Sequence, residues 1–121
     1  MGAGETFRSN GIFPGMALGE SAQNVTLTAD NQVVNPGRLP FLRLTSDSAT
    51  ATSRTFVLTS GSVDGQVLSI VLVGAASKAC ELASSGNVTM TGGTWTAAVG
   101  DTLTLQWDQI SAIWREKGRG Q

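Results

Sequence analysis

The sequence predicts an all-β protein: a β-sandwich or jelly-roll-like domain of about eight short antiparallel strands, preceded by an extended N-terminal arm. From Val25 onward, apolar residues alternate with polar ones at a period of two, which is typical of half-buried strands. Residues that form turns separate these runs at short intervals. Valine and threonine, which fit a pleated surface, fill the runs, and no window of about ten residues keeps an uninterrupted helical spacing.

The expected strands can be placed in order along the chain. Turn-forming pairs such as Asp30-Asn31 and Asp64-Gly65 mark their limits. We expect strands near residues 24–28, 39–44, 54–59, 66–73, 79–83, 87–91, 102–107 and 110–116, with an additional short strand around 95–99. The chain then divides into the arm (1–21), the β-sandwich domain (22–116) and a C-terminal tail (117–121).

The alternation also predicts which side chains are buried. In the run 102–107, Leu103, Leu105 and Trp107 share one face, while threonine and glutamine occupy the other. Leu68 and Ile70 share a face of their own run in the same way. We expect these side chains in the core.

The run from Val67 to Val73 is apolar on both faces, because its leucines and isoleucine point one way and its valines the other. A sandwich covers one face of such a strand with its own core. The second face must lie against another layer, the N-terminal segment or a neighbouring subunit. Oligomerisation is the simplest solution for so small a chain, while a central strand between two layers of one subunit explains the pattern equally well.

Residues 1–21 show neither the strand period nor the helix period. They contain five glycines and Pro14, with widely spaced apolar residues at Phe7, Ile12 and Phe13. These three large groups are too few to build a core. We therefore expect an arm that lies against a partner, with Phe7, Ile12 and Phe13 as partner-binding residues.

Charge and composition exclude several classes of function. Charged residues make up 14% of the chain and the formal net charge is -1, so no overall field attracts nucleic acid or an anionic membrane. Cys80 is the only cysteine, which excludes an intrachain disulfide. The first residues lack the pattern of a signal peptide, and no apolar run is long enough to span a bilayer. We expect a soluble product made in a cytoplasm.

The residues needed for most catalytic sites are missing. The chain has no histidine, so Ser-His-Asp and Cys-His catalysis are excluded, and one cysteine cannot make a zinc site. We expect Cys80 to be a buried, inert thiol. Aspartates such as Asp64, Asp101 and Asp108 adjoin turns, where capping of backbone N–H groups explains them. Because calcium and phosphate loops are also missing, we expect no enzyme activity, cofactor or metal.

The tryptophans offer one binding hypothesis, because exposed rings form platforms for sugars. Trp107 continues the inward face of its strand, and Trp114 shares parity with Ile110, so we expect both in the core. Trp95 follows Gly92-Gly93, a position that fits a loop tip. We keep Trp95 as a candidate partner-binding residue.

The second half of the chain resembles the small β-modules of tailed-bacteriophage surface proteins. The segments that carry the resemblance are Asp64-Gly65-Gln66-Val67-Leu68-Ser69-Ile70, Gly86-Asn87-Val88-Thr89-Met90, Gly100-Asp101-Thr102-Leu103-Thr104-Leu105-Gln106-Trp107-Asp108 and Trp114-Arg115-Glu116. Such modules occur as terminal domains of tail fibres and spikes and as capsid decoration, or cement, proteins. The resemblance spans about residues 64–116 and implies a homotrimer.

The sequence ahead of the module favours one of these two branches. A fibre or spike generally carries a shaft with repeats, and an arm stands in that place here. The resemblance therefore implies a virion protein, made in the host cytoplasm, that binds the major capsid protein and stabilises the capsid. The alternative is a glycan- or receptor-binding module of a tail fibre or spike, with Trp95 and the loop from Ser46 to Ser53 as its contact surface.

Overall fold

The computed structural model describes residues 24–47, 54–75 and 80–120. Within these ranges the chain forms ten strands and no helix, so the predicted all-β fold is confirmed. The strands are β1 (Asn24–Leu27), β2 (Gln32–Val34), β3 (Phe41–Ser46), β4 (Arg54–Leu58), β5 (Val67–Ala75), β6 (Cys80–Leu82), β7 (Val88–Thr89), β8 (Trp95–Ala97), β9 (Thr102–Asp108) and β10 (Ile113–Gly120).

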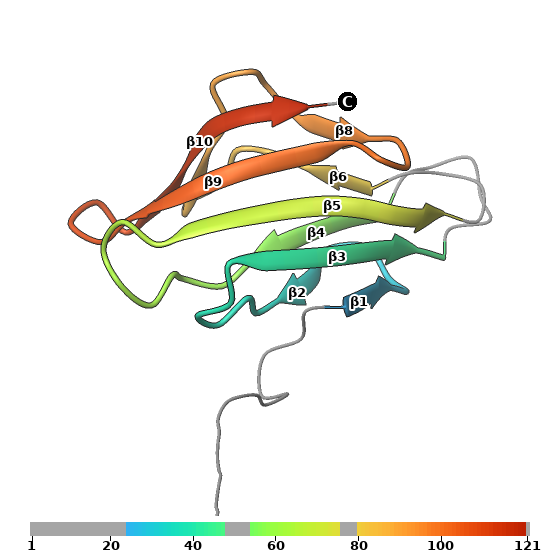
Figure 1. Cartoon of the computed structure of the whole chain (residues 1–121), viewed down its shortest axis with the longest axis horizontal. Helices are drawn as coiled ribbons and strands as arrows, with labels where there is room; N and C mark the ends of the chain where they lie inside the picture. The colour runs from blue at the N-terminus through green and yellow to red at the C-terminus, as the bar shows by residue number, and fades with distance from the viewer. Residues whose placement is uncertain (1–23, 48–53, 76–79, 121) are drawn as a thin grey trace, which may run out of the picture.

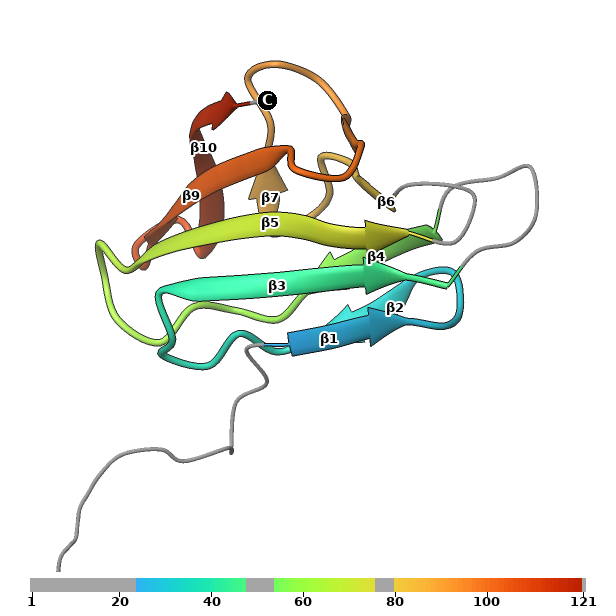
Figure 2. The ribbon, with the colours of Figure 1, turned by 45° about the vertical axis from the view of Figure 1, so that its right-hand side comes forward.

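The strands form two sheets, which lie as two layers in Figures 1 and 2. The six-stranded sheet has the order β1-β3-β5-β9-β10-β7, and the four-stranded sheet has the order β2-β4-β6-β8. The longest strands, β5, β9 and β10, lie side by side in the six-stranded sheet. This sheet therefore provides the broadest regular surface of the described chain.

Most strand pairs are parallel, which corrects the antiparallel prediction. Among the described strands, β1-β3, β3-β5, β2-β4, β4-β6 and β10-β7 are parallel, and β5-β9, β9-β10 and β6-β8 are antiparallel. From β1 to β6 the chain alternates between the two sheets, so each strand returns to its own sheet in the same direction. The jelly-roll-like alternative, which is built from antiparallel strands, does not fit these pairs.

Two element assignments also differ from the prediction. The three-residue strand β2 was not predicted, because a run so short carries too little alternation to be recognised. The residues predicted to be a C-terminal tail continue β10 as far as Gly120. There Gly118 and Gly120 pair with Thr104 and Thr102 of β9, after an irregularity in register between Glu116 and Gly118. Main-chain pairing with β9 thus extends the strand through a polar stretch.

Side chains from both sheets form one hydrophobic core. The predicted core residues Leu68, Ile70, Leu103 and Leu105 are fully buried, and Trp107 is 2% exposed. They meet Leu82 and Phe56 of the four-stranded sheet in the same cluster. Burial of apolar side chains from both sheets is what holds the two layers together.

Polar groups add links between the layers. Trp107 of β9 and Trp114 of β10 are neighbours in the six-stranded sheet, and their ring centroids lie 5.3 Å apart. Across the layers, Trp114 Nε1 donates a hydrogen bond of 2.9 Å to the carbonyl of Thr59, the residue after β4. Asn87 Nδ2 donates to the carbonyl of Leu58, at the end of β4, over 2.7 Å. These bonds satisfy buried polar groups and tie the β7 and β10 edge to the opposite sheet.

Candidate functional site

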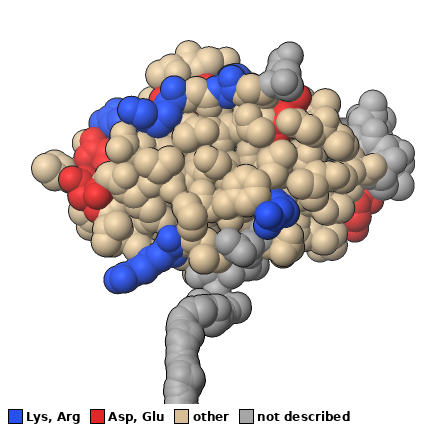
Figure 3. Space-filling model, in the orientation of Figure 1, with Lys and Arg blue, Asp and Glu red and all other residues tan. Residues whose placement is uncertain are grey.

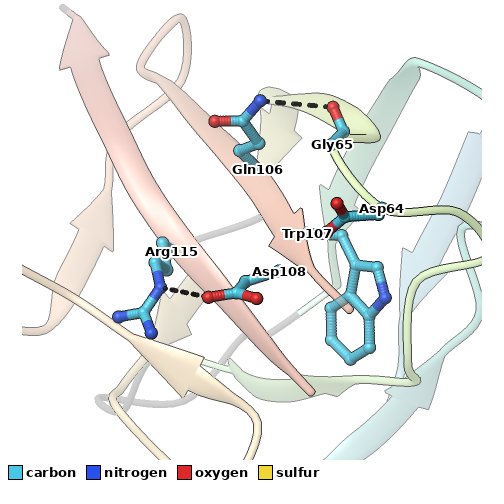
Figure 4. A pocket seen from close by; sticks show the side chains of 6 residues that line it. All are labelled: Asp64, Gly65, Gln106, Trp107, Asp108 and Arg115. Atoms are coloured by element: carbon cyan, nitrogen blue, oxygen red, sulfur yellow. Dashed lines mark hydrogen bonds and ion pairs between the residues drawn. The ribbon is translucent and has the colours of Figure 1, made fainter. Parts of the chain in front are cut away.

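A shallow hollow of about 280 Å³ lies where the loop before β5 meets the end of β9. Its lining consists of Asp64, Gly65, Gln106, Trp107, Asp108 and Arg115. Figure 4 shows Asp108 and Arg115 turned toward each other across the hollow and Gln106 turned toward Gly65. Its two carboxylates and its guanidinium make the hollow the best candidate for a catalytic or ligand-binding site among the described residues.

The carboxylates of this hollow are engaged in holding the chain together. Asp108 Oδ1 accepts the N–H groups of Ile110 and Ser111 at 3.1 and 3.2 Å, and Asp108 Oδ2 accepts Arg115 Nε at 3.0 Å. Asp64 Oδ1 accepts the N–H of Gln109 at 2.9 Å. The predicted turn-capping role of these two aspartates is confirmed, and Asp101 does the same for Ala98 at 2.9 Å.

The electrostatics of the hollow also disfavour proton transfer. Hydrogen bonds from the Ser111 N–H and from Arg115 lower the pKa of Asp108, so this carboxyl stays ionised at neutral pH and has no proton to donate. Trp107 is 2% exposed and presents no free ring face for stacking. The hollow has the properties of a well-capped turn.

Cys80 and the acidic residues form no reactive centre in the described ranges. The Cys80 side chain is fully buried, and burial raises the pKa of its thiol to about 12, so the thiolate needed for nucleophilic attack does not form at neutral pH. No three His, Cys, Asp or Glu residues in the described ranges are grouped so that they could hold a metal ion.

The most distinctive surface is the outer face of the six-stranded sheet. We use this name for the outward side chains of its three adjacent central strands β3, β5 and β9. They are Phe41, Arg43, Thr45, Val67, Ser69, Val71, Val73, Thr102, Thr104, Gln106 and Asp108. Arg43 and Asp108 are the charged residues among these eleven, and Asp108 forms an ion pair with Arg115 of β10. Figure 3 looks onto this side of the molecule, where most charged groups gather toward the rim.

Strand pairing sets the layout of the outer face. Phe41 lies opposite Ser69, which lies opposite Thr104, and Arg43 lies opposite Val71, which lies opposite Thr102. The outward valines of β5 therefore occupy the middle of the face, and Val67 and Val73 are 44% and 48% exposed. The predicted second apolar face of this strand exists, and no other layer in the described part of the chain covers it.

Arg43 is held by an aromatic ring on its own strand. Its guanidinium carbon lies 4.6 Å from the centroid of the Phe41 ring, in a cation–π contact. No carboxylate in the described ranges forms an ion pair with Arg43. This pair was not predicted, although residues two apart on a strand share a face and their proximity follows from the sequence.

The predicted partner-binding residues have different outcomes. Trp95 does not sit at a loop tip: it lies on β8, opposite Leu82 of β6, and is 3% exposed. The prediction of an accessible Trp95 ring is wrong, because β8 continues the four-stranded sheet directly after the glycine turn. Phe7, Ile12 and Phe13 lie outside the described residues, as does most of the loop from Ser46 to Ser53.

A second unpredicted feature is an ion pair on the inner side of β10. Arg119 Nε and Nη2 donate to the Glu116 carboxylate over 2.7 and 2.9 Å, and Glu116 Oε1 also accepts the Gly92 N–H at 2.9 Å. Arg119 Nη2 donates to the carbonyl of Gly93 over 2.8 Å. The pair clamps the β7–β8 loop onto β10, and we call it the Glu116–Arg119 clamp.

Comparison with known proteins adds no relative to this picture. No protein-family model matches the chain, and a search of curated proteins finds no match. In the part of the chain that the structure describes, no helix has the length and apolar character needed to cross a membrane.

Proposed function

We propose that this protein is a structural virion component that decorates and stabilises a phage capsid by binding the lattice of the major capsid protein. In this proposal the protein is a homotrimer on the capsid surface, made in the host cytoplasm, with no cofactor and no reaction. The observation that carries the proposal is the sparsely charged outer face of the six-stranded sheet, where two of the eleven outward side chains, Arg43 and Asp108, carry a charge. Such a face suits contact with protein better than contact with a phosphate backbone or an ionic substrate.

The point at which residues 1–23 join the described body supports binding to a partner. β1 is an edge strand of the six-stranded sheet, so residues 1–23 join the described body at the margin of that sheet. Phe7, Ile12 and Phe13 each gain roughly 1.5 to 3 kcal/mol on burial, while ordering each backbone residue costs about 1 to 2 kcal/mol. Three such residues cannot order a segment of this length alone. A protein lattice is the kind of surface that would supply the remaining contacts.

The described body suits a mechanical role. Its two layers share one core, and hydrogen bonds from Trp114 and Asn87 join the β7 and β10 edge to the end of β4 and the residue after it. A body with a continuous core transmits strain rather than deforming, which a clamp between capsid subunits requires.

The alternative function, a glycan- or receptor-binding module, depended mainly on an accessible Trp95. Trp95 is buried, and so is Trp107, the aromatic residue that lines the hollow. Phe41 is the one partly exposed ring among the described residues, and the Arg43 guanidinium lies over it at 4.6 Å, so that ring face is already occupied. We therefore prefer the capsid proposal.

Sedimentation with undecorated capsids of the parent phage tests this function. The full-length protein should pellet with capsids and saturate at a fixed number of copies per capsid. Deletion of residues 2–20 should leave the far-UV circular dichroism nearly unchanged and reduce capsid binding sharply. The matched control is Val33→Ser, which alters an exposed valine on β2 of the other sheet and should bind as the wild type does.

Two results would contradict this proposal. If the full-length protein does not pellet with the capsids, the capsid is not its partner. If the deletion variant stays folded and binds with full affinity, Phe7, Ile12 and Phe13 are not the anchors.

A further inference from the structure

We infer that the side-chain amide of Gln32 takes the place of a neighbouring strand along the free edge of β1 and so prevents a further strand from adding to the six-stranded sheet. We call this contact the Gln32 cap. In a solution of the pure protein, the strand that the cap excludes is an edge strand of another copy. The inference concerns the described body alone and does not depend on the proposed function.

One side of the β1 backbone has no partner strand among the described residues. β1 is an edge strand of its sheet, and β3 is its neighbour. The carbonyl of Leu27 accepts the N–H of Asp47 at 3.1 Å, just beyond the end of β3, so this carbonyl faces β3. Main-chain groups alternate in direction along a strand, and the carbonyl of Thr26 and the N–H of Thr28 therefore point toward the free edge. An added strand would form its hydrogen bonds with these two groups.

The Gln32 amide forms hydrogen bonds with both groups. Gln32 Nε2 donates to the carbonyl of Thr26 over 3.2 Å, and Gln32 Oε1 accepts the N–H of Thr28 at 2.9 Å. A carboxamide carries a donor and an acceptor, as a peptide group does, so it can replace the main chain of an adjoining strand. A strand that arrived at β1 would have to displace both bonds.

The turn between β1 and β2 places Gln32 within reach of β1. Asn31 has a φ of 56°, the left-handed conformation that asparagine adopts more readily than most residues. Its N–H donates to Thr55 Oγ1 over 2.8 Å, and Thr55 Oγ1 donates to Asn31 Oδ1 over 3.2 Å. Gln32 itself pairs with Phe56 of β4, and β1 and β2 lie at the same margin of the two layers (Figures 1 and 2). The cap therefore joins the edge strands of both sheets.

β1 lacks the other features that protect an edge strand. Natural sheets prevent edge-to-edge pairing with very short edge strands, charged side chains, prolines and β-bulges. β1 is the longest edge strand of the described sheets, with four residues against three in β2 and β8 and two in β7. Its sequence, Asn24-Val25-Thr26-Leu27, contains no charge and no proline, and its register with β3 is regular. The Gln32 cap supplies the protection that this strand lacks.

Gln32→Ala removes the cap, and amide hydrogen exchange followed by NMR measures the effect on β1. The Thr28 N–H should exchange about tenfold faster than in the wild type, the factor that corresponds to the loss of one hydrogen bond. The Asp47 N–H should keep its wild-type rate, because it depends on the pairing of β1 with β3. Gln106→Ala is the matched control: it removes a glutamine amide that donates to the carbonyl of Gly65 over 3.3 Å, but on the central strand β9.

Self-association shows whether the cap excludes a further strand. Sedimentation velocity over a range of concentrations should show larger species for Gln32→Ala than for the wild type or the control. Adding Thr26→Pro should restore the wild-type profile, because proline removes an N–H that points to the free edge and leaves the hydrogen bonds between β1 and β3 in place. If Gln32→Ala does not fold, or if its Asp47 N–H also exchanges rapidly, Gln32→Met takes its place, because methionine is unbranched and has no amide.

Three results would overturn the inference. An unchanged Thr28 exchange rate in the folded variant would mean that the Gln32 amide does not hold the edge. Faster Thr28 exchange without larger species would mean that the open edge accepts no strand. Larger species that persist after Thr26→Pro, or that Gln106→Ala also forms, would come from another surface.

Discussion

At the scale of single residues, Gly61 has a role that its small size makes necessary. A Cβ atom at this position would lie 2.6 Å from Cδ2 of the Trp107 ring. The ring has little room to move, since it is 2% exposed, packs against Trp114 and donates to Gln109 Oε1 over 2.5 Å. Gly61 therefore lets the loop before β5 lie directly against the core.

Gly61→Ala should destabilise the protein by about 1 to 3 kcal/mol, the usual cost of forcing extra atoms into a packed site. Chemical denaturation followed by tryptophan fluorescence measures the change. Gly86→Ala is the control, because nothing lies within 4 Å of a Cβ added at Gly86. Equal stability of the two variants would show that Trp107 can move aside freely.

The Glu116–Arg119 clamp gives a second prediction at this scale. The Glu116 side chain is 4% exposed, and hydrogen bonds from Arg119 and then from the Gly92 N–H lower its pKa from 4.5 to about 2. The unfolded chain therefore binds a proton to Glu116 at a higher pH than the folded chain does. The stability that the clamp contributes is fully present above about pH 4.5 and is lost as the pH falls toward about 2.

Glu116→Gln should reduce stability at neutral pH by about 1 to 3 kcal/mol, because Arg119 would lose its charged partner. The difference in unfolding free energy between wild type and variant should shrink as the pH falls from 4.5 toward 2. Denaturation curves at several pH values measure this difference. Glu81→Gln on β6, which removes a carboxylate outside any ion pair of the described residues, is the control. A pH-independent difference for Glu116→Gln would refute the assigned role of the clamp.

At the scale of elements, β9 shows how alternation divides a strand between two surfaces. Leu103, Leu105 and Trp107 face the core, while Thr104 and Gln106 face outward. Leu105→Ala should cost about 2 to 5 kcal/mol of unfolding free energy, as large-to-small changes in cores do. Val33→Ala, at a position that is 65% exposed, should change stability by less than about 0.5 kcal/mol. A similarly small effect at Leu105 would mean that the inward face of β9 is assigned wrongly.

The faces of the strands were predictable from the sequence, but their partners were not. Alternation in β5 and β9 marked Leu68, Ile70, Leu103 and Leu105 as core residues correctly, because the side-chain period of a strand depends only on the strand itself. Pairing direction depends on where the chain goes after each turn. A turn that forms a hairpin and a turn that crosses to the other layer carry the same Gly, Asn and Asp signals, so the parallel pairs were missed.

The candidate surface was predictable only in part. The valines of β5 indicated a second covered face, but Phe41 and Arg43 joined it through the parallel pairing of β3 with β5, which the sequence does not reveal. Glu116 and Arg119 were assigned near or within a polar tail. They lie opposite Leu105 and Leu103, on the inward side of β10, because β10 continues alongside β9 beyond its irregularity in register.

At the scale of the whole molecule, the described chain is a two-layer body with one core and a sparsely charged face on its larger sheet. The N-terminal segment joins this body at the edge strand β1. The proposed function assigns both this segment and the outer face to contacts with the capsid. In that proposal the two surfaces together would hold the protein on the capsid lattice.

Calorimetric melting of undecorated capsids, with and without the purified protein, tests capsid stabilisation most directly. A ligand that binds the assembled lattice and not its dissociated subunits raises the melting temperature by mass action. We predict a melting temperature that rises with added protein and saturates at full decoration, with the variant that lacks residues 2–20 giving little or no rise. An unchanged capsid melting temperature at saturating full-length protein would contradict the account.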